Sequence, residues 1–209
     1  MLRIDSVRKG ASGVVTIAAG GSSFLVDPGL LGKLGLPLAS LTVGAELDES
    51  AVEFLALAAE TREAERRGLA LLARAEQSTF MLRCKLEQRG FSGRAVAIAL
   101  DSLSASGILN DRRFARAYTA SRLGQRRSKA EGPSSLVAAL RERGLDRSLA
   151  AEVVAELLDP EERAEVLSRA AAKELERSGG DRDETRRRLR ALGFKSEEIT
   201  DYFDTLADK

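Results

Sequence analysis

Three segments of this chain repeat one pattern, and the repeat constrains the fold more than any other feature. The segments are LRCKLEQRGF (82–91), LVAALRERGL (136–145) and TRRRLRALGF (185–194), which start 54 and then 49 residues apart. Each ends in a glycine that is followed by Phe or Leu. Glycine accepts the left-handed conformation that closes a helix. The pattern therefore predicts three short helices that end at Gly90, Gly144 and Gly193.

The match continues beyond each glycine and predicts a second helix. Apolar residues recur four and three residues apart, which places them on one helix face. They are Val96, Leu100 and Leu103 in the first copy; Ala150, Val154 and Leu157 in the second; and Ile199, Phe203 and Leu206 in the third. A third helix is predicted over 111–124 and again over 160–178. Such units bury their apolar faces against neighbours, so we expect a mainly α fold of tandem three-helix repeats in an elongated, curved array.

The first 47 residues have a different pattern. Short β-branched runs separated by glycines predict a small N-terminal antiparallel β meander, with a helical turn opened by Pro28. Asp48 is a suitable N-cap for a long helix that tolerates Gly68. The expected organisation is a β element at 1–47, a linking helix at 48–77, repeats at 78–131 and 132–178, and a two-helix repeat at 179–209.

The composition argues against catalysis. Histidine is absent and Cys84 is the only cysteine. A Cys/His zinc site, a disulfide framework and a His-dependent triad are therefore excluded. No GxxxxGK[ST] loop is present, so a P-loop ATPase is not supported. We expect no cofactor and no enzymatic activity. No apolar run approaches the length of a membrane span, and the expected location is the cytoplasm.

Positive charge is concentrated in one part of the chain. Residues 78–131 contain eleven basic and four acidic residues, a net charge of +7, although the whole chain has a net charge of only +1. This concentration indicates an anionic partner at one place. A solvated, arginine-rich helix face is the alternative.

The segment between the first two copies resembles the RecX family of bacterial recombination regulators. The resemblance is carried by Gly107-Ile108-Leu109-Asn110-Asp111, by Phe114-Ala115 and by Tyr118. Arg122, Gly132-Pro133, the helix of Leu136 and Leu140, and Gly144 also fit. Ile108 and Leu109 are candidates for burial, and Asn110 or Asp111 for a helix N-cap. The resemblance extends over about residues 70–209. Where family members commonly carry basic residues around the Gly-Pro, this chain has Glu131, Ser134 and Ser135.

The resemblance implies a role for the chain. It implies binding of the RecA recombinase filament on DNA, in the filament groove, and damping of strand exchange and coprotease activity in DNA repair and the SOS response. The expected partners are RecA and single- or double-stranded DNA, which is contacted without base preference. The basic residues that we expect to contact DNA or the filament are Arg112, Arg113, Arg116, Arg122, Arg126, Arg127, Lys129, Arg186, Arg187 and Arg190.

Two other functions fit the same sequence. Short helices separated by glycine turns are also typical of helix-turn-helix transcription regulators, which contact bases as well as phosphates. A helical-repeat scaffold that binds only protein would show no salt-dependent binding to DNA.

Overall fold

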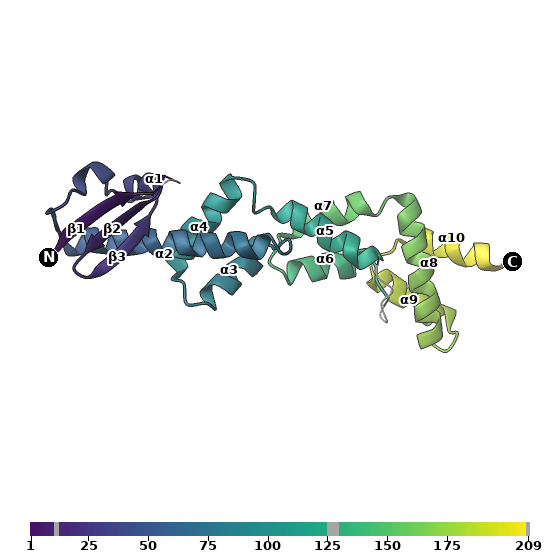
Figure 1. Ribbon diagram of the computed structural model, residues 1–209. Helices are drawn as coiled ribbons and strands as arrows, with labels where there is room; N and C mark the ends of the chain where they lie inside the picture. Colours follow the sequence, from purple (N-terminus) through teal and green to yellow (C-terminus); the bar gives the residue numbers. More distant parts are fainter. Residues whose placement is uncertain (11–12, 125–129, 208–209) are drawn as a thin grey trace. The chain divides into compact units, whose positions relative to one another are not determined.

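The computed structural model describes residues 1–10, 13–124 and 130–207 (Figure 1). The chain divides into two compact units, Met1–Leu109 and Asn110–Lys209. The predicted fold class is confirmed, because helices dominate the described residues and the strands lie together in a small N-terminal sheet.

The first unit begins with an antiparallel sheet in the order β3-β2-β1-β4. Its strands are β1 (Leu2–Lys9), β2 (Val15–Ala19), β3 (Ser22–Val26) and β4 (Glu46–Leu47). The helical turn predicted at Pro28 is α1 (Pro28–Lys33), and the 3-10 turn η1 (Leu38–Ser40) follows it. Leu55 and Ala58 of the next helix lie in the same apolar cluster as Ile4 and Ile17 of the sheet. The β element is therefore stabilised by burial against a helix, which so small a sheet requires.

That helix, α2 (Glu49–Leu72), continues past the sheet to α3 (Thr79–Glu87) and α4 (Gly93–Ala105), as Figure 1 shows. Its N-cap is Asp48, as predicted, and the Asp48 carboxylate accepts from the amide of Ala51. Gly68 is buried where α2 crosses α4, and a Cβ there would lie 2.9 Å from the Leu103 side chain. Gly68 is therefore required for the close approach of the two helices.

The second unit contains six helices among its described residues. In chain order they are α5 (Asp111–Gly124), α6 (Pro133–Arg141), α7 (Arg147–Leu157), α8 (Pro160–Arg177), α9 (Arg182–Ala191) and α10 (Ser196–Ala207). Most of them begin at a capping side chain that accepts hydrogen bonds from the first turn. The capping residues are Asn110, Asp146, Asp159 and Asp181.

The three repeat helices end as predicted. Gly90, Gly144 and Gly193 have φ values of 89°, 83° and 94°. In each copy the amide after the glycine donates to the carbonyl five residues earlier; from Phe91 to Leu86, for example, the distance is 3.4 Å. A left-handed glycine with this 6→1 bond forms a Schellman motif, which also turns the next apolar side chain back onto the helix.

The long helices pack with the repeat pair that follows them in the chain. α2 packs against α3 and α4, α5 against α6 and α7, and α8 against α9 and α10. A side chain of each long helix also holds the second helix of its pair, through Glu60 and Ser92, Arg116 and Glu156, and Arg163 and Glu198. The predicted grouping had instead kept the first long helix apart as a linking helix and joined α5 and α8 to the pair before each of them, and those boundaries stay a prediction.

Most predicted core positions are buried, but Leu157 is half-buried and two positions are exposed. Leu206 is 42% exposed, although its counterpart Leu103 is buried. The reason is that α10 packs less extensively on α8 and α9 than α4 does on α2. Ile108 is also 42% exposed, whereas Leu109 turns inward onto the core of the first unit.

Candidate nucleic-acid interface

The α5 helix places its predicted cations against the acidic face of α7. Phe114 and Ala115 fix the helix by burial in the core. Arg112 then reaches Glu152, with an Nη2–Oε1 distance of 3.1 Å, and also pairs with Glu156. The hydrogen bond that Arg112 donates to Glu152 is the largest influence that raises the pKa of Arg112.

Two further observations complete the α5 surface. Arg116 donates to Glu156 over 2.8 Å, so Glu156 is shared between two arginines. The backbone amide of Arg113 donates to the Asn110 side chain and so forms part of the helix cap. The positive charges of Arg112 and Arg116 are therefore largely balanced by α7. A phosphate at these two arginines would compete with the carboxylates that they already bind.

Arg122 is half-buried. Its guanidinium donates to the Tyr118 hydroxyl over 2.8 Å and pairs with Glu131, and its side chain is only 18% exposed. Burial, the largest single influence, lowers the pKa of Arg122, but Glu131 and Tyr118 more than offset it and the pKa is raised. Arg143 also contacts Tyr118: its guanidinium carbon lies over the Tyr118 ring, 4.2 Å from the ring centre.

This cluster also gives a physical reason for an acid before Gly132-Pro133, where the resemblance in the sequence implied a basic residue. Glu131 stands there and pairs with the half-buried Arg122. A basic residue at that place would repel Arg122 in a region of reduced solvent screening. The local pairing therefore favours an acid over a basic residue at position 131.

In the last copy, α9 begins at Asp181, whose side chain caps the helix at the amides of Asp183 and Glu184. Arg187 pairs with Glu184 over 2.6 Å. Arg186 lies 3.8 Å from Asp183, and its guanidinium carbon is 5.1 Å from the centre of the Phe203 ring. Asp183 and Glu184 therefore neutralise part of the charge of this arginine run.

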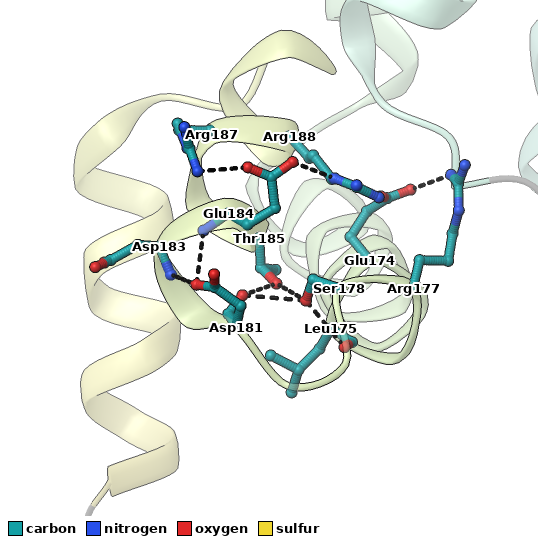
Figure 2. A network of polar contacts seen from close by, with 10 residues as sticks. All are labelled: Glu174, Leu175, Arg177, Ser178, Asp181, Asp183, Glu184, Thr185, Arg187 and Arg188. Atoms are coloured by element: carbon teal, nitrogen blue, oxygen red, sulfur yellow. Dashed lines mark hydrogen bonds and ion pairs between the residues drawn. The ribbon is translucent and has the colours of Figure 1, made fainter.

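Figure 2 shows how Arg188 joins the arginine-rich helix α9 to α8. Arg188 lies between Glu184, at 2.8 Å, and the buried carboxylate of Glu174, at 3.2 Å. Glu174 also accepts from Arg177 over 2.8 Å. The hydrogen bonds that Arg188 donates to Glu184 and to Glu174, in that order of influence, raise the pKa of Arg188.

The remaining predicted cations differ in their surroundings. Arg190 is exposed, and no ion pair joins it to another described residue. Arg126, Arg127 and Lys129 lie outside the described residues, so their role stays a prediction.

Two further exposed arginines, Arg141 and Arg147, line one groove of the second unit and were not among the predicted cations. The available signal was their position on either side of Gly144, at the end of α6 and the start of α7. The Gly144 turn brings these two positions to one side of the helix pair.

Neither a metal site nor a membrane span is found in the described part of the chain. No group of three or more Asp, Glu, His or Cys residues there is placed to hold a metal ion. No helix among residues 1–10, 13–124 and 130–207 combines the length and apolar character needed to cross a bilayer.

Comparison with known proteins gives relatives in sequence and in fold. No protein-family model matches this chain. Regulatory protein RecX of Prosthecochloris aestuarii is 31% identical over 151 residues, covering 70% of this chain and 95% of that protein. Regulatory protein RecX of Syntrophotalea carbinolica is 32% identical over 142 residues, covering 65% and 90%.

Two solved structures share the fold. The crystal structure of a regulatory protein RecX matches with a TM-score of 0.72 at 21% identity, over the full length of both chains. RecX from Lactobacillus salivarius matches with a TM-score of 0.60 at 17% identity, over 72% of this chain and 98% of that one.

Proposed function

Because this chain belongs to the RecX family of regulatory proteins, we propose that it regulates a RecA recombinase by binding the RecA filament on DNA. In this proposal it lodges in the filament groove and damps strand exchange and coprotease activity. It would thereby act in DNA repair and the SOS response, in the cytoplasm and without catalysing a reaction. The observation that carries the proposal is the match to two RecX proteins over 95% and 90% of their own lengths.

DNA binding through phosphates is the second part of the proposal. It rests on the net charge of +7 over residues 78–131. Among the predicted cations, we expect Arg126, Arg127 and Lys129 to be the main contacts to DNA phosphates. Arg190 comes next, because it is exposed and has no ion pair with another described residue. Arg112, Arg116 and Arg187 come later, because a phosphate must compete there with a carboxylate that is already bound.

Titration of the chain into RecA-coated single-stranded DNA tests the proposal. ATP turnover by RecA is expected to fall as the chain is added, and strand exchange is expected to fall with it. The matched controls are RecA without the chain and the chain with DNA alone, which should hydrolyse no ATP. ATP turnover and strand exchange that both stay constant at saturating chain would contradict the proposed regulation.

A further inference from the structure

A groove of about 440 Å³ in the second unit combines an apolar wall with positive charge. Small side chains of α6 and α7, including Val137, Ala138 and Ala151, form the wall. Arg141, Arg147 and Arg163 are the charged residues that line it, and no acidic residue does. A volume of this size suits a few side chains of a ligand.

Two of the three arginines carry uncompensated charge. Arg141 and Arg147 are exposed, and neither forms an ion pair with any residue that the structure describes. Arg163 differs, because Glu198 holds its Nε at 2.5 Å. The acids on the neighbouring face of α7, Glu152 and Glu156, are paired with arginines of α5. The groove therefore has a net positive charge that its own surroundings do not neutralise.

The third copy of the repeat shows why the groove is open in the second. By the 49-residue spacing, Val137 corresponds to Arg186, and Val154 corresponds to Phe203. In the third copy, the guanidinium of Arg186 covers the Phe203 ring at 5.1 Å. In the second copy, a short valine stands at the equivalent place and leaves the apolar wall uncovered. The opening thus results from side-chain size on a shared backbone.

We propose that this groove binds an acidic segment of a partner protein. One aliphatic side chain of the segment would lie on the wall at Ala138 and Ala151, and carboxylates on either side would pair with Arg141 and Arg147. Guanidinium groups bind carboxylates through two parallel hydrogen bonds. The lining contains no aromatic side chain on which a base could stack, which favours a peptide over single-stranded nucleic acid.

This inference goes beyond the proposed function, because it requires neither DNA nor a recombinase. The test uses the full chain alone and a short fluorescein-labelled peptide that alternates Glu and Leu. Fluorescence anisotropy should show binding. A peptide with Gln in place of Glu, and one with Ser in place of Leu, should each bind at least about tenfold more weakly, as expected for the loss of a charged hydrogen bond or a buried side chain.

Two variants locate the binding. Arg147→Gln should weaken binding of the Glu-Leu peptide about tenfold. Ala151→Leu, which narrows the groove by filling its wall, should also weaken it. The matched control is Arg94→Gln, an exposed arginine in the first turn of α4, which should leave binding unchanged. Thermal melting of each variant verifies that it is folded.

Three results would overturn the proposal. Equal binding of the Gln and Glu peptides would remove the role of charge. Wild-type affinity in both Arg147→Gln and Ala151→Leu would place the peptide elsewhere. Displacement of the peptide by an oligothymidylate, with the same sensitivity to Arg147→Gln, would make nucleic acid the occupant. Because RecA is absent from this assay, its failure is distinct from a failure of the proposed regulation.

Discussion

The backbone amide of Ser134 donates to the carbonyl oxygen of Leu192 over 2.9 Å. This bond joins the start of α6 to the end of α9, so the second and third copies of the repeat meet through their backbones. A glycine on each segment, Gly132 before α6 and Gly193 after α9, permits the two backbones to approach this closely. A Cβ on Gly132 would lie 2.6 Å from the Leu192 oxygen, and a Cβ on Gly193 would lie 2.8 Å from the Ser134 nitrogen.

Gly193→Ala is expected to destabilise the chain more than Gly180→Ala. Both glycines have left-handed φ values, 94° and 92°, but a Cβ on Gly180 would meet nothing within 4 Å. Gly180→Ala should cost about 1–2 kcal/mol for the conformation alone. Gly193→Ala should cost about 1–3 kcal/mol more for the clash. Urea unfolding measures both, and equal losses would show that the contact relaxes without cost.

Glu174→Ala is expected to lower the free energy of unfolding by about 1–3 kcal/mol, because Glu174 is a buried acceptor for two arginines. Its side chain is 5% exposed and contacts Arg177 and Arg188. Glu176→Ala, on the exposed face of the same helix, is the control and should change the stability by less than about 0.5 kcal/mol. Similar urea midpoints for the two variants would argue against a structural role for Glu174.

Stability is expected to fall in acid through Glu198. Burial, the largest influence, raises the pKa of Glu198, but the hydrogen bond from Arg163 and that from the Lys195 amide outweigh it and hold the pKa below its ordinary value of 4.5. The stabilisation is therefore complete above pH 4.5 and is lost as the pH falls through the lower, folded-state pKa.

Glu198→Gln should remove this part of the acid dependence, as measured by urea midpoints from neutral pH downward. The control Glu197→Gln, at an exposed neighbouring position, should keep the wild-type profile. If Glu198→Gln and wild type lose stability in parallel below pH 4.5, the ion pair with Arg163 does not contribute.

Replacing Arg126, Arg127 and Lys129 together with alanine is expected to weaken DNA binding by a similar factor on any sequence. Each lost phosphate contact should flatten the dependence of log affinity on log salt by about 0.7–0.9. Fluorescence anisotropy on two unrelated single strands across a salt series measures this. Base-dependent losses would favour a transcription regulator instead.

The matched control for that triple variant is Arg112→Ala with Arg116→Ala. These two arginines are paired with Glu152 and Glu156, so their loss should lower the melting temperature slightly and flatten the salt dependence less than the triple variant does. If the double variant flattens the salt dependence and the triple variant does not, the DNA contact lies on α5.

The purified chain is expected to have no ATPase, nuclease or protease activity. It has no histidine and no P-loop, and its one cysteine therefore has no histidine to activate it. Steady turnover by the chain alone, abolished by a point mutation within it, would show that catalysis was wrongly excluded.

Local signals allowed much of the fold to be predicted. The helix expected at 111–124 is α5 with the same bounds, because Asn110 provides a cap at its start and Phe114 a buried contact. The three closing glycines were equally predictable, since a left-handed residue after a helix strongly favours glycine. Such features depend only on residues close in sequence.

Contacts between distant residues were beyond the same reasoning. Arg112 and Glu152 are 40 residues apart, and nothing in either local sequence specifies the pair. The half-buried pairing of Arg122 with Glu131 was not predicted for a related reason, because an arginine near other basic residues looks like a surface cation. Ion pairs between helices distinguish the structural arginines from the exposed ones. These pairs depend on how the helices pack, so they can be recognised only in the folded structure.

The packing of each long helix with the pair that follows it affects how the chain folds during synthesis. α5, α6 and α7 occupy consecutive residues, so their mutual contacts close over short stretches of chain. Folds dominated by such local contacts form quickly. Each three-helix group is complete as soon as its last helix leaves the ribosome, without waiting for later sequence. We therefore expect the groups to form in chain order, so that a nascent chain exposes at most one unfinished apolar face at a time.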